Sequence, residues 1–363
     1  MTKDFPLRPS RLEPIFVPRI WGARTLAPLF PEKTKLSEPI GEVWLTGDDC
    51  RFAEGPFAER TIHEAWHEMP VEWAGTHFNA DDSARAAFPL LVKFLFPADK
   101  LSVQVHPHDE YAQKHEAASG GVGKTEIWYT VAAQSDSEVF GGLKPGITRQ
   151  AFRRAIDEGT VENCLTRIPI TAGDAIFVPA GTAHTIGAGP VLCEIQQNSD
   201  LTYRVYDYDR RQKDGTSRPL HVNKAMDVLN FERQRGGKVQ PARVPAHGGE
   251  VSYFIACRYF ALEKWQFAAP IDLHTESEHF ELWIVIAGRG RINWGAKSGS
   301  GHGESEYHPG EAWFVPAGLA SWRIVPAART AMLRTYVPDL ASYAAQLDAI
   351  GISAESVAQV VRR

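Results

Sequence analysis

Four residues in the first half of this 363-residue chain carry side chains that suit a divalent metal ion: Gln104, His106, Glu126 and His184. Together they offer two imidazole nitrogens, one carboxylate and one amide oxygen. Zinc accepts such a donor set, and manganese and iron are the next candidates. We therefore predict one metal ion per chain, with a coordination position left open for water or a substrate.

The predicted β-strands explain how these donors come together. In the strand 101–106, Ser102, Gln104 and His106 are two residues apart, so their side chains share one face. Glu126 opens the next predicted strand, and His184 follows a tight turn that contains proline and glycine. The spacing thus predicts that the donors converge from three strands.

An internal repeat accompanies this donor set. The sequence pattern of residues 173–184 recurs at residues 310–321. The predicted strand that begins at Glu126 likewise recurs as the strand that begins at Glu281. Such a repeat indicates a duplicated fold. The spacing G-x5-P-x-G-x2-H in the first copy resembles the second motif of cupin sandwiches. Because Ser321 stands in the second copy where the first has His184, we expect metal chemistry only in the first copy.

Short β-like runs separated by glycine and proline make up most of the chain, which is typical of an all-β sandwich or barrel. We predict a mainly β protein with two cupin-type jelly-roll β-sandwich domains and a few short helices. The domains are a catalytic one at 1–232 and a degenerate one at 251–363, joined by a linker at 233–250 that is rich in glycine, proline and charge. Helical spacing is found at 81–88, 148–158, 223–229 and 340–361.

Composition excludes several classes of partner. The formal net charge of -5 argues against a general nucleic-acid binder. No run of ~18 apolar residues is present, so no membrane span is predicted. The four cysteines show no C-x-x-C spacing, which favours reduced thiols and a cytoplasmic location over a disulfide framework. Oligomeric state is not predicted by any of these features.

Three segments together resemble the type I phosphomannose isomerases. Their order and spacing match the family from Arg19 to about Lys224, and the lack of a large helical insertion is similar to its short bacterial and archaeal branch. Val43 and Gly47 depart from the pattern, since serines are expected there, which bears on sugar preference. The matching segments are Ser102-x-Gln104-x-His106-Pro107, Lys124-x-Glu126 and Glu194-x3-Asn198-Ser199-Asp200-x3-Arg204.

The resemblance implies an enzyme that interconverts mannose 6-phosphate and fructose 6-phosphate with one zinc ion. By position, the four donors named above would hold the metal. A phosphorylated sugar would be the substrate, and the residues expected to line its pocket are Lys93, Lys124, Glu194 and Arg204. This reaction moves a proton between C1 and C2 through an enediol(ate), whose developing negative charge a nearby cation stabilises.

Within that reaction, several roles stay open at the level of sequence. Glu194 is a candidate base, and His106 or a metal-bound water is an equal alternative. Arg204 and Lys124 would supply positive charge either to the enediolate or to the phosphate. Ser102, on the same strand face as the donors, could donate a hydrogen bond to the phosphate.

Two other classes of function compete with the isomerase. A cupin metalloenzyme such as a dioxygenase usually has an H-x-H motif, whereas Gln104 stands here at the first of those positions. A non-catalytic sugar-binding cupin is expected to lack the metal donors or the cations Lys124 and Arg204, all of which are present. The residues therefore favour the isomerase.

Overall fold

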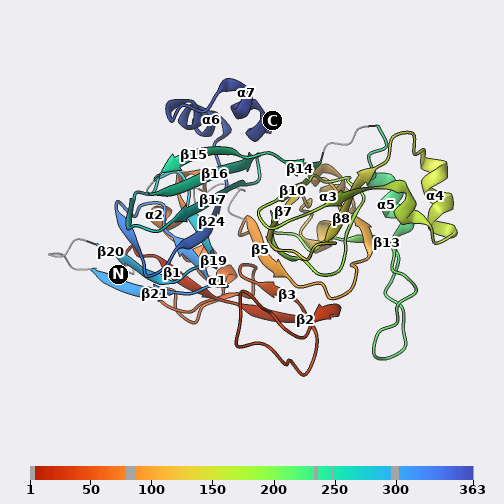
Figure 1. The fold of residues 1–363 in the computed structure, drawn as a ribbon, viewed down its shortest axis with the longest axis horizontal. Coiled ribbons are helices and arrows are strands. Elements are labelled where there is room, and N and C mark those ends of the chain that lie inside the picture. Colours follow the sequence, from red (N-terminus) through yellow and green to blue (C-terminus); the bar gives the residue numbers. More distant parts are fainter. Residues whose placement is uncertain (1–4, 79–86, 233–235, 247, 296–301, 363) are drawn as a thin grey trace. The chain divides into compact units, whose positions relative to one another are not determined.

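The computed structural model describes residues 5–78, 87–232, 236–246, 248–295 and 302–362 (Figure 1). Over these residues the fold is mainly β, as predicted, and it divides into two compact units. One consists of residues 16–43 and 91–239 and carries the four predicted metal donors, so we call it the donor unit. The other consists of residues 1–15, 44–90 and 240–363, and we call it the companion unit. No described helix is long and apolar enough to span a membrane.

These units follow different boundaries from the predicted domains 1–232 and 251–363, because the N-terminal segment belongs to the later part of the chain. Strand β1 (Ser10–Glu13) pairs with β22 (Ala312–Val315) on one side and with β4 (Arg51–Phe52) on the other. A strand of four residues paired with one about three hundred residues away leaves no local signal in the sequence.

The predicted linker at 233–250 contains strands over much of its described length. β14 (Gly237–Val239) pairs with β10 in the donor unit, and β15 (Ala242–Ala246) pairs with β16 in the companion unit. The chain therefore passes from one unit to the other close to residue 240. Glycine and proline in this segment suggested a loop, yet Gly237 tolerates its φ of 122° at the start of a strand.

The donor unit is a sandwich of two sheets. The larger has the order β14-β10-β7-β12-β5-β3-β2 and the smaller β13-β6-β11-β8-β9. Side chains from both sheets form one buried cluster that includes Trp21, Trp128 and Ile186. The strands not yet given are β2 (Ile15–Ala23), β3 (Ile40–Trp44), β5 (Leu90–Leu95), β6 (Val103–Val105), β7 (Glu126–Ala132), β8 (Glu138–Leu143), β9 (Leu165–Pro169), β10 (Ala175–Val178), β11 (His184–Ile186), β12 (Val191–Gln197) and β13 (Tyr203–Tyr206).

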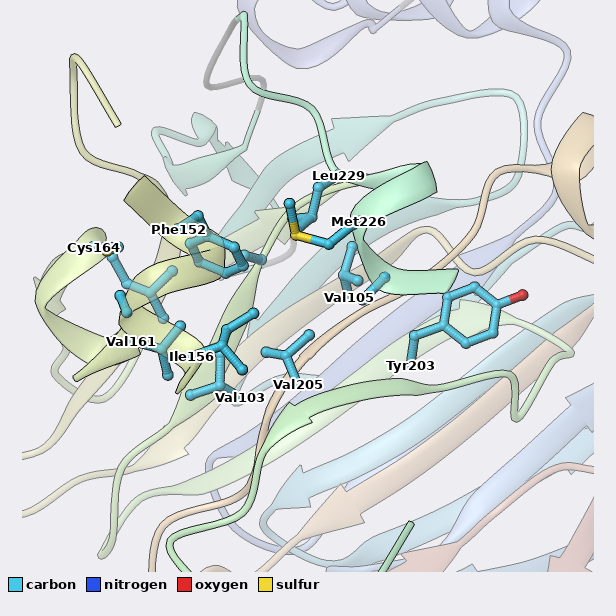
Figure 2. Close-up of a cluster of buried hydrophobic side chains, with 14 of the residues drawn as sticks. Val103, Val105, Phe152, Ile156, Val161, Cys164, Tyr203, Val205, Met226 and Leu229 are labelled. Atoms are coloured by element: carbon cyan, nitrogen blue, oxygen red, sulfur yellow. The ribbon is translucent and has the colours of Figure 1, made fainter. Parts of the chain in front are cut away.

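Helices of the donor unit cover one face of the smaller sheet. Figure 2 shows Phe152 and Met226 packed toward Val103 and Val105 of β6. Because side chains alternate along a strand, this packing directs Gln104 to the opposite face, away from the helices. The helices are α3 (Asp109–His115), α4 (Arg149–Asp157) and α5 (Val222–Val228), with 3-10 turns η3 (Ala117–Ser119) and η4 (Val161–Cys164).

Two of the predicted helices are confirmed in this unit. Thr148 caps α4 by accepting a hydrogen bond from the backbone N–H of Ala151, and Gly159 follows the helix with φ 68°. Helix α5 agrees with the predicted 223–229 to within a residue at each end. Helix α3 lacks the strong hydrophobic periodicity that would have predicted it, since Ala112 is its one buried residue.

The companion unit repeats the two-sheet arrangement, with orders β15-β16-β17-β24-β19-β22-β1-β4 and β18-β23-β20-β21. Its core packs Trp283, Trp313 and Trp322 between the sheets. The remaining elements are β16 (Gly249–Ala256), β17 (Ala261–Phe267), β18 (Ile271–Leu273), β19 (Glu281–Ala287), β20 (Gly290–Trp294), β21 (Gly303–Tyr307), β23 (Trp322–Pro326), β24 (Thr330–Tyr336), α1 (Ile62–Glu68), α2 (Val71–Ala74), η1 (Thr76–Phe78), α6 (Leu340–Ala349) and α7 (Ala354–Val360).

The helix predicted at 340–361 is two helices, α6 and α7. Gly351 adopts φ 85° between them, and Ser353 then caps the second helix. Helix α1, which was not predicted, begins with a capping box between Thr61 and Glu64 that the sequence does contain. The helix predicted at 81–88 lies outside the described residues, apart from its last two positions.

The sequence repeat is also a repeat of strand register. Glu126 begins β7 and Glu281 begins β19. Two residues later, Trp128 faces Glu194 across the sheet in the donor unit, and Trp283 faces Arg334 in the companion unit. Glu194 and Arg334 therefore occupy equivalent positions but carry opposite charges.

The partner of each residue has also changed sign. Glu194 pairs with Lys93 on the neighbouring strand β5, with Nζ 3.0 Å from Oε1. Arg334 pairs with Glu263 on its neighbouring strand β17, at 3.1 Å, and with Glu281 at 2.6 Å. All these carboxylates are buried. Each unit therefore has a buried ion pair at this equivalent position, but the strand that carries the carboxylate in one unit carries the cation in the other.

We expect Arg334→Met to lower the free energy of unfolding by about 3 to 5 kcal/mol, because it leaves two buried carboxylates without their cation. Arg291→Met removes an exposed arginine that pairs with Glu304 at 3.4 Å in the same unit, and it should change the free energy by less than about 1 kcal/mol. Urea denaturation of both variants measures the difference. Equal effects would show that the buried cluster contributes no special stability.

Candidate functional site

The donor unit brings the four predicted metal donors together. Gln104 is the central residue of β6, His106 follows that strand by one residue, and Glu126 and His184 each begin a strand. His184 lies directly opposite Gln104 in the pairing of β11 with β6. Ligand atoms of the two histidines and the glutamate all lie within 4.8 Å of one another.

Both imidazole rings are oriented by backbone carbonyls. Nδ1 of His106 donates to the carbonyl of Leu201 at 2.8 Å, and Nδ1 of His184 donates to the carbonyl of Thr182 at 2.8 Å. These hydrogen bonds direct Nε2 of each ring toward the donor group. Burial lowers the pKa of His184 to about 4 and the pKa of His106 well below its usual value, so both rings are neutral, as metal ligands must be.

The Glu126 carboxylate lies between the two rings, with its oxygens 3.4 Å from Nε2 of His184 and 3.5 Å from Nε2 of His106. Oε2 lies 3.3 Å from Nζ of Lys124, but among the described residues neither oxygen accepts a well-aligned hydrogen bond, and His106 Nε2 has no hydrogen-bond partner there. Burial, and then repulsion from Glu194, raises the pKa of Glu126 to about 7. A buried polar atom without a hydrogen bond costs about 1 to 3 kcal/mol, and a bound cation would contact both the carboxylate and His106 Nε2. The residues therefore fit a metal ion.

Gln104 is the fourth predicted donor and lies next to His184. Its Nε2 lies 3.3 Å from Nε2 of His184, while its Oε1 accepts a hydrogen bond of 3.3 Å from the Ser102 hydroxyl. The two ends of an amide have nearly the same shape, so a half-turn about the last side-chain bond would present the oxygen to a cation. Ser102, Gln104 and His106 thus lie on the same face of the strand, as predicted.

A tight turn fixes His106 and His184 relative to each other. The N–H of Gly181 donates to the carbonyl of His106 at 2.8 Å, three residues before His184. Gly181 has φ 83°, and a Cβ at this position would lie 2.9 Å from the carbonyl oxygen of Val228. Glycine is therefore required at position 181 for two reasons: its backbone has a positive φ, and there is no space for a side chain.

The loop that carries Lys124 is held by residues that sequence reasoning missed. Asp109 accepts hydrogen bonds from the N–H of Gly123 at 3.0 Å and from the side chain of Gln197 at 2.8 Å. Gln197 in turn accepts from the N–H of Thr125 at 2.9 Å. Lys124 then places its Nζ 3.3 Å from Glu126. An aspartate and a glutamine in polar segments give no sequence signal of this role.

A cavity of about 400 Å³ opens beside the donor group. Gln104 and Lys124 belong both to its wall and to the surroundings of the donors. All five predicted catalytic or substrate-binding residues line it, namely Lys93, Ser102, Lys124, Glu194 and Arg204. The structure thus gathers every residue predicted for the substrate pocket around one cavity next to the donor group.

Glu194 is held firmly in the cavity wall. Its Oε1 lies 3.0 Å from Nζ of Lys93, and its Oε2 accepts a hydrogen bond from the indole N–H of Trp128 at 3.0 Å. Burial opposes ionisation of Glu194, but Lys93 and then Lys124 outweigh it, and the pKa is lowered. Burial likewise opposes the charge on Lys93, and Glu194 more than compensates, so the pKa of Lys93 is raised. Both groups are charged.

The Ser102 hydroxyl connects Arg204 to the metal donor Gln104 by hydrogen bonds. Its Nε donates to Oγ of Ser102 at 3.1 Å, and Ser102 donates in turn to Gln104. Its Nη1 donates to the carbonyl of Pro219 at 3.0 Å. Burial, followed by repulsion from Arg218, lowers the pKa of Arg204, though a guanidinium remains charged at neutral pH.

Five further charged or titratable residues line the cavity and were not predicted as site residues: Arg19, Glu42, Asp200, Arg218 and His221. Arg19 and Glu42 lie on neighbouring strands and form two parallel hydrogen bonds of 3.0 Å. The alternation of side chains along these two strands is the sequence signal that could have predicted that Arg19 and Glu42 face the same side. Arg218 lies in the long loop between β13 and α5, where no periodicity exists (Figure 1).

The companion unit holds a different arrangement at the equivalent place. Glu281 accepts hydrogen bonds from Arg334 and from the indole of Trp283, both at 2.6 Å. His274 donates through Nδ1 to the carbonyl of Ala320, next to the serine that replaces the second histidine. Within the described part of the chain, the one cluster of histidine and acidic side chains close enough to hold a metal is that of the donor unit.

Comparisons with known proteins agree with this geometry. A family model described as phosphomannose isomerase type I, catalytic domain, matches residues 10–135. The probable mannose-6-phosphate isomerase GmuF of Bacillus subtilis is 37% identical over 289 residues, which cover 78% of this chain and 87% of the relative. The mannose-6-phosphate isomerase of Streptococcus mutans is 32% identical, with coverage of 86% and 95%.

The fold has a solved relative as well. The crystal structure of the mannose 6-phosphate isomerase from Bacillus subtilis matches with a TM-score of 0.79 and 30% identity, over 90% of this chain and 99% of that one. Sequence and structure therefore agree over most of both chains. The chain belongs to the type I phosphomannose isomerase family.

Proposed function

We propose that this protein is a zinc-dependent mannose-6-phosphate isomerase that interconverts mannose 6-phosphate and fructose 6-phosphate through an enediol(ate). The observation that carries the proposal is the buried Glu126 between two oriented imidazoles, beside a cavity with several cations. His106, Glu126, His184 and Gln104 would hold the ion. Two neutral imidazoles, a carboxylate and an amide oxygen favour zinc, although manganese or iron would also fit.

A bound divalent cation would supply Lewis-acid stabilisation of negative charge on the sugar oxygens O1 and O2. The chain adds two fixed positive charges near the same place. Lys124 lies 3.3 Å from Glu126, and Arg204 lies one hydroxyl away from Gln104. Both cations are held before substrate arrives, so little reorganisation accompanies the build-up of enediolate charge.

The geometry favours Glu194 as the base that takes the proton from carbon. His106 has its Nδ1 engaged with Leu201 and its Nε2 among the metal donors, so neither nitrogen is available for proton transfer. Glu194 lines the cavity and is ionised, which is the state that a base requires. Lys93, in contact with Glu194, would steady the carboxylate and could donate a hydrogen bond to a sugar oxygen.

We also propose a cytoplasmic location. The cysteines at 50, 164, 193 and 257 are all buried and unpaired, in keeping with a reducing compartment.

Removing the metal provides the first test. We expect chelation to abolish conversion of mannose 6-phosphate and zinc to restore it, with one ion bound per chain by elemental analysis. Manganese and iron(II) should be compared in the same assay, and glucose 6-phosphate should serve as the alternative substrate. Full activity in protein freed of metal would rule out the proposed mechanism.

The assignment of the base gives a second test. We expect Glu194→Gln to lower kcat by about 10²- to 10⁴-fold while the bound metal stays at one ion per chain, because the amide cannot accept the proton. Glu232→Gln is a suitable control, since Glu232 is exposed and should leave kcat unchanged. If Glu194→Gln retains most of its kcat, the base must be another group, such as a water held at the metal site.

A further inference from the structure

Lys124 lies outside the strand pairing that fixes the metal donor beside it. Glu126 begins β7 and pairs with Val178 of β10 and with Gln196 of β12, so the sheet holds its backbone. Lys124 precedes that strand by two residues, yet it is buried and lines the cavity, with its Nζ 3.3 Å from Glu126. Because a lysine side chain is a flexible four-carbon stem, the place of its charge depends on how firmly its backbone is fixed.

The backbone around Lys124 is held by three separate acceptors. The N–H of Gly123 donates to Oδ1 of Asp109 at 3.0 Å, and the N–H of Thr125 donates to Oε1 of Gln197 at 2.9 Å. The N–H of Lys124 itself donates to a backbone carbonyl at 3.0 Å. Two of the three acceptors are therefore side chains, which a substitution can remove.

Asp109 controls both of these side-chain contacts. Its Oδ1 also accepts a hydrogen bond from Nε2 of Gln197 at 2.8 Å. A carboxylate accepts hydrogen bonds and donates none, so it binds the NH2 end of the amide and leaves the carbonyl end for the N–H of Thr125. We call Asp109 and Gln197 the clamp, because together they fix the residue before Lys124 and the residue after it.

The segment that carries Lys124 also packs directly against the clamp. A Cβ at Gly123 would lie 2.7 Å from the backbone nitrogen of Asp109 and 2.8 Å from its Oδ1. A side chain at position 123 would therefore push the segment away from the first residue of helix α3. The hydrogen bond between Gly123 and Asp109 depends on the close approach that glycine allows.

Other groups of the site have support that is independent of the clamp. Glu194 lies within β12 and contacts Lys93 at 3.0 Å. The metal donors Glu126 and His184 each begin a paired strand. Loss of the clamp would therefore displace Lys124 while the candidate base and the metal donors keep their places.

We propose that Asp109 is a positioning residue for the reaction: through Gly123 and Gln197 it fixes Lys124 where its charge meets the substrate. Asp109 does not line the cavity, so it acts through Lys124 rather than on the substrate. The proposal rests on the proposed function in so far as isomerisation is the reaction that is measured.

The test uses the full-length, metal-loaded protein and the variants Asp109→Ala and Asp109→Asn. For Asp109→Ala we expect kcat for mannose 6-phosphate to fall about 10- to 100-fold with KM changed less than about 3-fold, because a displaced cation stabilises the developing enediolate charge poorly. Asp109→Asn keeps an acceptor oxygen at the same place, so its kcat should stay within about 5-fold of that of the parent protein.

Glu110→Ala is the matched control. Glu110 is the next residue in the first turn of the same helix and is exposed, so its variant loses the same charge near the helix N-terminus without touching the clamp. Its kcat should stay unchanged. Metal content and thermal midpoint, measured for every variant, exclude a loss of metal or of folding. An equal fall in kcat for both alanine variants would overturn the proposal.

A double-mutant cycle shows whether Asp109 acts through Lys124. In a Lys124→Ala background, which retains the candidate base and the metal donors, we expect Asp109→Ala to lower the residual kcat by less than about 2-fold, because the group that it positions is already gone. A further loss as large as that in the parent background would show that Asp109 acts by another route, and the proposal would be wrong.

Hydrogen exchange separates this proposal from the isomerase assignment, since it needs no activity. We expect the amides of Gly123 and Thr125 to exchange at least about 10-fold faster in Asp109→Ala than in the parent protein, and at the parent rate in Glu110→Ala. A protein with this exchange pattern that isomerises no hexose phosphate would refute only the isomerase. An active isomerase in which Asp109→Ala changes neither exchange nor kcat would refute only the positioning role.

Discussion

The carboxylate of Glu126 is the constraint on which the donor unit depends. A glutamate at the start of a central strand, fully buried and between two neutral imidazoles, has no hydrogen-bond donor among the described residues and gains only a lysine at 3.3 Å. Burial and the nearby Glu194 raise its pKa, so the ionised carboxylate is disfavoured at this position. The backbone carbonyls that turn both imidazoles inward, and the glycine turn that fixes them, are arranged around that carboxylate and make sense when a cation lies there.

The companion unit meets the same constraint in a different way. Glu281 begins the equivalent strand and is equally buried, but Arg334 extends from the neighbouring strand to bind it. The position of Arg334 is that of Glu194 in the other copy, so the change that supplies a cation in one unit removes the carboxylate that would act as a base. Loss of the second histidine at Ser321 therefore accompanies a wider rearrangement of charge.

Much of the fold and of the candidate site could be predicted because β-structure has a period of two. Alternation around Gln104 and the repeated strand beginning at Glu281 were enough to indicate two sandwiches and to gather four donors. The compact units could not be predicted, since the pairing of β1 with β22 leaves no local trace. Arg218 could not be predicted either, because its position depends on Asp207 and on a loop without periodicity.

The two ways of neutralising a buried glutamate differ in their dependence on the surroundings. Arg334 is covalently part of the chain, so its contribution to the stability of the companion unit does not depend on the concentration of any free metal ion. The ion expected beside Glu126 is a separate molecule, and the stability that it adds would grow with the logarithm of its free concentration once that exceeds the dissociation constant. Within one polypeptide, one barrel would be buffered against scarcity of metal, and the other would respond to it.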